Sequence, residues 1–236
     1  MTKFQIVCHM LTSLDGRVSG QFLNEDGLEP YEAFYYQKML PTKTNNWICG
    51  RKTFAEHFTA ENQLDLTPFK DRVIPRIDYL HPERADSFAI AVDPTGKLGW
   101  LSNTIGDDFP ERAGDHIVTI LSEQVSDAYL AYLQKIGVSY LFAGATHELS
   151  WQQALLKLHQ YLGIERFMVA GGGTINGMFF QAGLIDELSL VVVPTLTGSV
   201  DGVSLIETQL PAEFQTFQLQ KVEVIAPNGL WLNYYK

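Results

Sequence analysis

Short apolar runs alternate along this chain with segments of helical periodicity, and this alternation restricts the fold more than any single motif does. Runs of strand length lie at Phe4–Leu11, Asn46–Gly50, Phe88–Asp93, His116–Leu121, Ser139–Ala143, Arg166–Ala170 and Glu187–Val193. Amphipathic helices are predicted at Pro30–Leu40, Asp127–Ile136 and Trp151–Leu162, and another helix begins at Arg51. The alternation predicts βαβ crossovers and therefore an α/β fold with a mainly parallel sheet.

The end of the chain breaks this pattern. Two further strand-like runs, Phe214–Ala226 and Leu230–Tyr235, flank the turn sequence Pro227-Asn228-Gly229, which predicts a C-terminal antiparallel hairpin. The polar stretch 60–86 contains three prolines and indicates a long excursion rather than a domain boundary. We therefore predict that the 236 residues form a single domain, residues 1–236.

Composition and charge argue against several classes of protein. The formal net charge of −10 opposes nucleic-acid binding, because such binding depends on clustered Lys and Arg. No run approaches the roughly 18 apolar residues of a membrane span, and the N-terminus lacks the order of a signal peptide, so we expect a cytoplasmic protein with no membrane partner. Cys8, Cys49 and the six histidines show no metal-ligand spacing, so we expect buried thiols and no metal site.

A strand, three glycines and a helix follow one another between Phe167 and Phe180. Glycines let a backbone approach a pyrophosphate closely, and the amides at a helix start favour an anion. The dinucleotide fingerprint Gly-x-Gly-x-x-Gly is not met, because Asn176 stands where the third glycine belongs. The junction Gly171-Gly172-Gly173 therefore predicts a phosphate site, with a tight turn that binds nothing as the alternative.

A second junction, Gly50-Arg51-Lys52-Thr53, adds two cations and a hydroxyl at a helix start, which suit a phosphate or the 2′-phosphate of NADP. Cations oppose the helix dipole there, and a bound anion would compensate them; a solvated basic helix start is the alternative. Two such junctions predict a dinucleotide across neighbouring strand ends, where open α/β sheets place their ligands.

A third segment, Thr12–Arg17, directly follows the first strand. It would place Asp15 at the mouth of the site, where a carboxylate can orient a substrate amide or hydroxyl. Asp15-Gly16 is also an ordinary turn pair, so a purely local role is the alternative.

In this order, the segments resemble the reductase family that includes the C-terminal reductase domain of the bifunctional riboflavin-biosynthesis deaminase-reductase, within the dihydrofolate reductase-like superfamily. The matching motifs are Ser13-Leu14-Asp15-Gly16-Arg17-Val18, Gly50-Arg51-Lys52-Thr53, Ala170-Gly171-Gly172-Gly173, Gly183-Leu184-Ile185-Asp186-Glu187-Leu188 and Pro194-Thr195-Leu196-Thr197-Gly198. The likeness spans nearly the whole chain. It implies a three-layer αβα fold and a homodimer formed through the C-terminal sheet region.

The resemblance also implies NADPH as the cofactor and a small molecule as the substrate. The cofactor contacts would be Leu11, Gly50, Arg51, Lys52, Thr53, Gly171, Gly172, Gly173, Thr174 and Ile175. Substrate contacts are predicted at Ser13, Asp15 and Glu32. Hydride transfer depends on orientation and water exclusion more than on a nucleophile, so no catalytic acid is nominated.

Three departures from the family pattern bear on the substrate. Ala170 stands where the riboflavin-pathway reductases carry Glu, His57 stands where they carry Asp, and their Ser-x-Trp segment finds no match between Gly20 and Leu40. We therefore predict an NADPH-dependent reductase of a small heterocyclic or carbonyl substrate, with 5-amino-6-(5-phosphoribosylamino)uracil reductase as the nearest named activity. The alternatives are a non-catalytic nucleotide-binding sensor or structural protein, and a dihydrofolate or pterin reductase.

Overall fold

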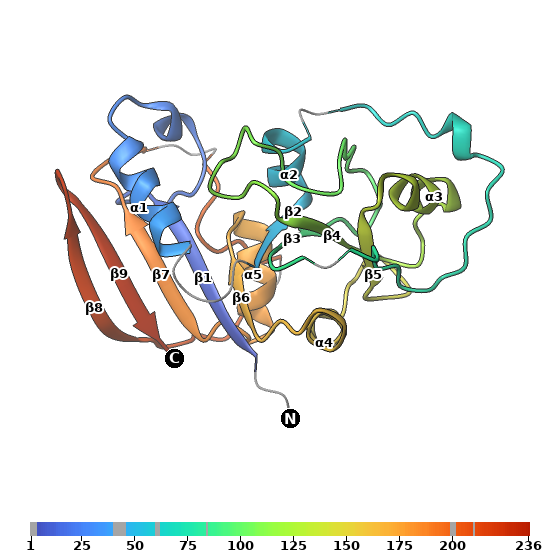
Figure 1. Ribbon diagram of the computed structural model, residues 1–236. Helices are drawn as coiled ribbons and strands as arrows, with labels where there is room; N and C mark the ends of the chain where they lie inside the picture. Colours follow the sequence, from blue (N-terminus) through green and yellow to red (C-terminus); the bar gives the residue numbers. More distant parts are fainter. Residues whose placement is uncertain (1–3, 40–45, 60–61, 84, 199–201, 210) are drawn as a thin grey trace. The chain divides into compact units, whose positions relative to one another are not determined.

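The computed structural model describes residues 4–39, 46–59, 62–83, 85–198, 202–209 and 211–236 (Figure 1). The chain forms two compact units, which are treated separately below. Unit 1 comprises residues 1–44 and 165–236, and unit 2 comprises residues 45–164. The predicted single domain over residues 1–236 stays a prediction.

The five strands of unit 1 lie side by side in the order β6-β1-β7-β9-β8. They are β1 (Gln5–Thr12), β6 (Arg166–Val169), β7 (Glu187–Val192), β8 (Gln218–Ile225) and β9 (Gly229–Tyr235). β1 pairs in parallel with both β6 and β7, whereas β9 runs antiparallel to β7 and β8. The predicted C-terminal hairpin is confirmed, but β8 begins at Gln218 and not at Phe214, whose side chain is fully exposed outside the sheet.

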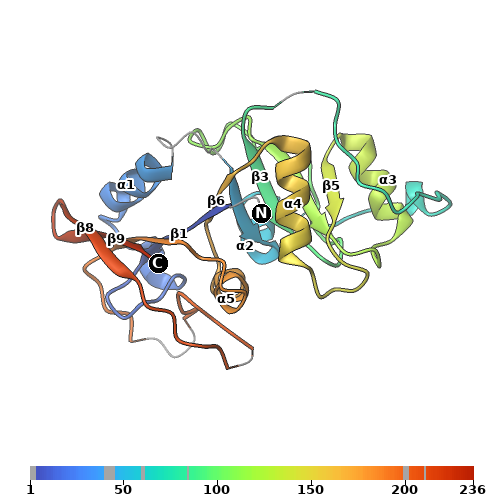
Figure 2. The same cartoon turned by 90° about the horizontal axis from the view of Figure 1, so that it is seen from below.

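Two helices of unit 1, α1 (Glu29–Met39) and α5 (Gly173–Gln181), cover opposite faces of this sheet (Figure 2). Neighbouring side chains of β1 point to opposite faces: Met10 lies against Gly171, which precedes α5, and Leu11 packs on the cluster beneath α1. The buried members of that cluster are Phe22, Leu28, Tyr31, Val191, Val193 and Ile225. The predicted helix Pro30–Leu40 is confirmed within its described part, and Leu40 itself lies outside the described residues.

A buried polar chain fastens α1 to the sheet through His9 on β1. The His9 Nε2 atom lies 3.0 Å from the carbonyl oxygen of Tyr35, which can only accept, so Nε2 carries the proton. Neutral His9 then accepts at Nδ1 from the Ser189 hydroxyl at 2.8 Å, and Ser189 accepts in turn from the Trp231 indole N–H. Burial first, and then the nearby charges of Lys38 and Arg166, lower the pKa of His9 to about 4.

We expect the stability of the protein to fall as the pH drops from about 6.5 to 4. Folding disfavours protonation of His9 and of buried His116, whose pKa burial also lowers to about 4, so the unfolded chain binds more protons in this range. For His9 alone the loss is about 3 kcal/mol. Urea midpoints measured between pH 7 and pH 4 check this, and His9→Gln should flatten the dependence; an unchanged slope would contradict it. Carboxylates with lowered pKa, such as Asp127, contribute only at more acidic pH.

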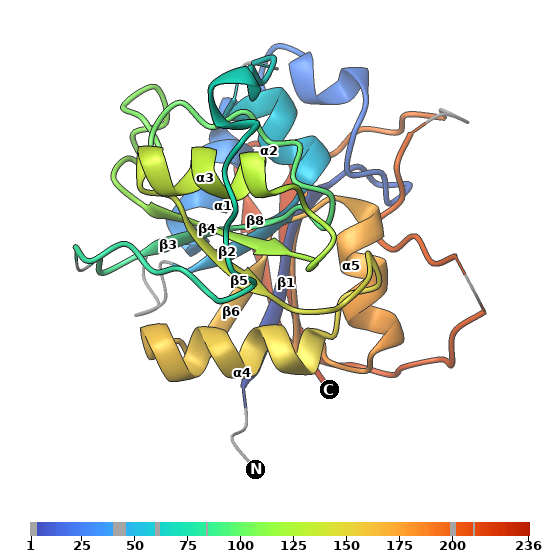
Figure 3. The same ribbon diagram turned by 90° about the vertical axis from the view of Figure 1, so that its right-hand side faces the viewer.

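Unit 2 contains a fully parallel sheet in the order β5-β4-β3-β2. Its strands are β2 (Trp47–Gly50), β3 (Phe88–Val92), β4 (His116–Leu121) and β5 (Ser139–Phe142), and its helices are α2 (Arg51–His57), α3 (Asp127–Ile136) and α4 (Trp151–Leu162). α3 and α4 lie on opposite faces of the sheet (Figure 3). The predicted bounds of both helices are confirmed.

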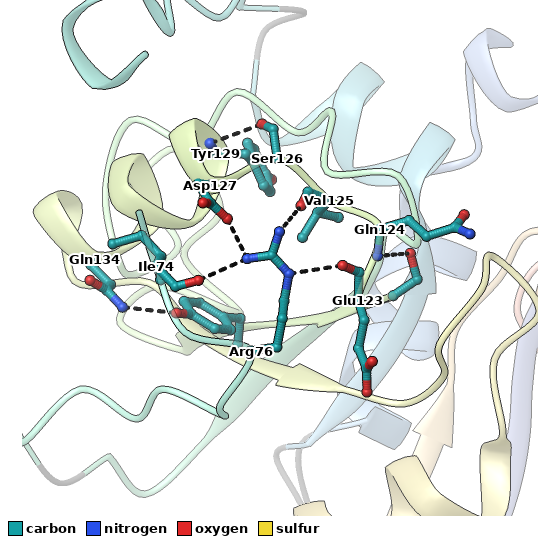
Figure 4. A network of polar contacts seen from close by, with 11 residues as sticks. Ile74, Arg76, Glu123, Gln124, Val125, Ser126, Asp127, Tyr129 and Gln134 are labelled. Atoms are coloured by element: carbon teal, nitrogen blue, oxygen red, sulfur yellow. Dashed lines mark hydrogen bonds and ion pairs between the residues drawn. The ribbon is translucent and has the colours of Figure 1, made fainter. Parts of the chain in front are cut away.

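The long excursion predicted for residues 60–86 is confirmed in its described parts, residues 62–83 and 85–86. The side chain of Arg76 holds it in place (Figure 4). The Arg76 guanidinium donates to the carbonyl oxygens of Ile74, Glu123 and Val125 and to the Asp127 carboxylate. Further along, Tyr79 and Tyr140 exchange two backbone hydrogen bonds, so the excursion covers the outer edge of β5. No helix in the described ranges combines the length and apolar character that crossing a bilayer requires.

Candidate functional site

The carboxyl ends of β6, β1 and β7 meet at one edge of the unit 1 sheet, because the three strands are parallel. Open α/β sheets bind ligands at such edges. Here the strands lead into three loops, residues 170–172, 13–20 and 193–198. These loops carry three of the motifs on which the sequence prediction rests.

The first loop leads from β6 into α5 and has no side-chain cap. Gly172 is the N-cap residue of α5, and no side chain hydrogen-bonds to the first amides of the helix there. Ser126 and Ser150, by contrast, cap α3 and α4 by accepting from the amides of Tyr129 and Gln153. The peptide bond between Gly171 and Gly172 is cis. Amides at a helix start that lack a side-chain acceptor suit an anion.

The three glycines of this loop differ in what surrounds them. A Cβ atom on Gly172 would meet nothing within 4 Å, so open space adjoins the helix start at this position. On Gly173 a Cβ would lie 2.3 Å from the carbonyl oxygen of Ser204, and on Gly177 it would lie 1.8 Å from that of Glu207. Gly173 and Gly177 are therefore required by close packing of the backbone, and Gly172 has the surroundings expected of a ligand contact.

Residues 202–207, here called the strap, cause this close packing, and sequence reasoning missed them. The Glu207 amide donates to the carbonyl oxygen of Gly173, and the Asn176 side-chain amide donates to that of Leu205 at 2.8 Å. The spacing of Gly173 and Gly177, one helical turn apart, was the available signal, because two small residues on one face of a helix allow another backbone to approach.

Ser13 and Asp15 lie in the loop after β1 and bond to each other. The Ser13 hydroxyl donates to Asp15 Oδ1 at 2.7 Å, and Asp15 also accepts from the backbone and hydroxyl of Thr197 and from the Gly198 amide. These hydrogen bonds, with that of Ser13 first, hold the pKa of Asp15 well below its usual range. The motifs around Asp15 and Thr197 are thus joined directly.

The remaining predicted residues fall in two places. In unit 1, Leu11 is near the end of β1, partly buried, and Glu32 is exposed on the first turn of α1. In unit 2, Gly50 ends β2 and is the N-cap residue of α2, again without a side-chain cap, while Lys52 is exposed in its first turn. The structure thus gathers Leu11, Ser13, Asp15 and Gly171–Ile175 within unit 1, and Gly50, Arg51, Lys52 and Thr53 within unit 2.

The Asp93 carboxylate and the two cysteine thiols could take part in catalysis by their chemistry, but both kinds of group have structural roles here. The buried Asp93 carboxylate follows β3 and accepts from the backbone amides of Lys97 and Leu98 at 2.6 and 2.9 Å, which closes the turn there. Cys8 and Cys49 are buried free thiols, and burial raises the pKa of Cys8 to about 12. Among the described residues, no group of three or more His, Cys, Asp or Glu side chains is arranged to hold a metal ion.

The second half of the chain matches a known protein family. The family model described as the RibD C-terminal domain matches residues 111–230, about half of the chain. The chain belongs to the RibD C-terminal domain family. The match runs from the segment before β4 to β9, and so includes the glycine loop, α5 and the strap.

Relatives of this RibD C-terminal domain protein agree with that placement. A stretch of 118 residues is 32% identical to the 2,5-diamino-6-ribosylamino-4(3H)-pyrimidinone 5′-phosphate reductase of Methanothermobacter thermautotrophicus and covers 50% of each chain. Among solved structures, a pyrimidine reductase-like protein from Corynebacterium diphtheriae matches with a TM-score of 0.66 at 12% identity, over 99% of this chain and 92% of that one. The Saccharomyces cerevisiae riboflavin biosynthesis reductase Rib7 matches with a TM-score of 0.62 at 15% identity, over 100% and 90%. The predicted fold class is confirmed.

Proposed function

We propose that this chain is an NADPH-dependent reductase of a small heterocyclic or carbonyl substrate, with 5-amino-6-(5-phosphoribosylamino)uracil reductase as the nearest named activity. The observation that carries the proposal is the start of α5, where uncapped amides adjoin the open space beside Gly172, in a chain of the RibD C-terminal domain family. By contrast, serine side chains accept hydrogen bonds from the first amides of α3 and α4, where no ligand is proposed.

The proposed cofactor contacts are those predicted from the sequence. The loop Gly171–Ile175 would hold the pyrophosphate, Leu11 would contact the nucleotide, and Gly50–Thr53 would hold a phosphate through Arg51 and Lys52. NADPH supplies the hydride when bound. The protein's part is to orient the two reactants and exclude water, with Ser13 and Glu32 as the proposed substrate-side residues. The sequence also assigns Asp15 to the substrate side. We assign no catalytic acid.

A screen of NADPH oxidation tests this function. Purified protein is mixed with NADPH and with pterins including dihydrofolate, flavin precursors, quinones and small carbonyls, and loss of absorbance of the reduced nicotinamide is followed. Turnover with any of these supports a reductase. Binding of NADPH without turnover of any candidate favours the nucleotide-binding sensor or structural protein, an alternative that Ala170 and His57 support because they replace acidic residues of the family.

We expect the pyrimidine substrate of the riboflavin-pathway reductases, a ribosylaminopyrimidine 5′-phosphate, to be a poor substrate of this protein. Ala170, the first residue after β6, stands in place of the family's Glu. The segment before and within α1 lacks the family's Ser-x-Trp and arginines. We expect little turnover of the ribosylaminopyrimidine 5′-phosphate at about micromolar concentration, an ordinary enzyme scale. The measurement is steady-state kcat/KM beside that of the best compound from the screen, and rapid turnover of the pathway compound would contradict the expectation.

We further propose that the protein acts in the cytoplasm as a homodimer. In support, β8 is the outer strand of the unit 1 sheet and exposes Leu219, Val222 and Val224, the last at 73%. Apolar outer strands invite pairing with another chain, and the outer strand β5 of unit 2 is covered by the excursion instead. Light scattering should give a dimer mass, and Val222→Lys with Val224→Lys should give a folded monomer; a monomeric wild type would refute the proposal.

A further inference from the structure

The Asp15 carboxylate is engaged on both oxygens by groups of its own chain. Oδ1 accepts from the Ser13 hydroxyl at 2.7 Å and the Thr197 amide at 3.1 Å, and Oδ2 accepts from the Thr197 hydroxyl at 2.8 Å and the Gly198 amide at 3.2 Å. A carboxylate has about four lone-pair directions, so little acceptor capacity is left for a substrate. The geometry is that of a clamp between the loops that follow β1 and β7.

The loop that this clamp fixes also holds the strap. The Leu205 amide donates to the carbonyl oxygen of Gly16 at 3.0 Å, and Gly16 has a positive φ of 74°, a conformation that suits glycine. Beside it, the Arg17 guanidinium donates to the carbonyl oxygen of Gly202 and to the Ser204 hydroxyl, at 2.6 and 2.9 Å. A displacement of residues 15–17 would therefore displace the strap.

The strap in turn holds the first turn of α5. Leu205 accepts from the side chain of buried Asn176, and the Glu207 amide donates to the carbonyl oxygen of Gly173. The close approach of the strap to Gly173 and Gly177 leaves no room for it to slide without moving the helix. Gly16, the residue next to Asp15, is thus linked to Asn176 in α5 by only two hydrogen bonds, both of which involve the backbone of Leu205.

We infer that Asp15 is a positioning residue for the glycine loop: its bonds to Thr197 fix the loop after β1, and that loop holds the strap against the start of α5. The inference rests on the proposed function in that the glycine loop is taken to bind NADPH. It gives Asp15 a role in cofactor binding in place of the substrate contact that the sequence predicts.

Asp15→Asn and Thr197→Val test the inference together. An amide at position 15 must turn its NH2 group toward the Thr197 or the Gly198 amide, and these backbone donors cannot reverse as a hydroxyl can. Thr197→Val removes the hydroxyl donor, and Thr197→Ser keeps it as the matched control. We expect each of the first two variants to weaken NADPH binding about three- to tenfold, the double variant to be no weaker than the poorer single one, and Thr197→Ser to bind as the wild type does.

Amide hydrogen exchange supplies a second readout that does not depend on the cofactor. Exchange in residues 172–177 should be faster in Asp15→Asn and Thr197→Val than in wild type or Thr197→Ser, while exchange in β3 and β4 of unit 2 stays unchanged. If Asp15→Asn raises only the KM for a substrate and leaves both NADPH affinity and this exchange unchanged, Asp15 is a substrate contact and the inference is wrong. If wild-type protein binds no NADPH, the proposed function fails, and the exchange experiment alone decides the positioning role.

Discussion

Replacing Gly172 by Asp is expected to weaken NADPH binding more than about a hundredfold while leaving the fold intact, since the loss of a charge-assisted contact and a new repulsion together exceed about 3 kcal/mol. Gly172 has φ −75° and ψ −173°, which any residue adopts, and a Cβ there meets nothing within 4 Å. The carboxylate would occupy the space at the helix start and repel a pyrophosphate. Calorimetric titration with NADPH, together with a thermal melt, measures both quantities.

Two matched variants separate binding from folding. Gly172→Ala adds a methyl group without charge and should cost much less affinity than Gly172→Asp. Gly177→Ala places its Cβ 1.8 Å from the Glu207 carbonyl oxygen and should lower the melting temperature by several degrees. A folded Gly172→Asp protein with wild-type affinity for NADPH would show that this loop does not hold the cofactor.

Replacing Arg51 and Lys52 together by Gln is expected to remove most of a ten- to hundredfold preference for NADPH over NADH. Both residues begin α2, where cations oppose the helix dipole, and a 2′-phosphate would relieve that cost. A charge-assisted hydrogen bond contributes about 1.5 to 3 kcal/mol, which corresponds to this preference. Titration of both nucleotides at fixed ionic strength against wild type and double variant provides the measurement.

The control for this prediction must change the net charge by the same amount elsewhere in unit 2. Lys70→Gln with Arg72→Gln does so on exposed residues of the excursion and should leave both affinities unchanged. If the Arg51 and Lys52 double variant loses affinity for both nucleotides equally, these cations face the pyrophosphate and recognition of the 2′-phosphate lies elsewhere.

Local signals in the sequence predict the elements of this fold well where a helix start and end are both marked. The amphipathic periodicity predicts α3 and α4 residue for residue. In the structure Ser126 and Gly137 cap α3, and Ser150 and Gly163 cap α4, so each helix ends where its periodicity ends. The predicted strand begins at Phe214, four residues before β8 begins in the structure. Residues 214–217 mix apolar and polar side chains as the strand itself does, and the sequence has no turn or capping signal that separates them from it. Packing, rather than pattern, decides that boundary.

In the candidate site, too, some features can be predicted from local sequence and others cannot. The strand-glycine-helix junction is visible locally, and the structure puts Gly172 at the uncapped start of α5. The clamp between Asp15 and Thr197 joins residues 182 positions apart, and the strap contacts glycines from a segment with no motif of its own. Contacts of this kind depend on the tertiary fold, so the sequence predicts which residues matter there but not what they touch.

The division of unit 1 into two distant pieces of chain has a consequence for biosynthesis. β1 comes from the first piece and lies between β6 and β7 of the second, with Gln5 paired to Arg166 and Val7 to Glu187. Unit 2, residues 45–164, is continuous and is translated before either partner strand of β1. The apolar β1 strand must therefore remain unpaired until its partner strands have left the ribosome, and we expect a released chain that ends at residue 164 to expose this strand to chaperones and proteases while unit 2 is already protected.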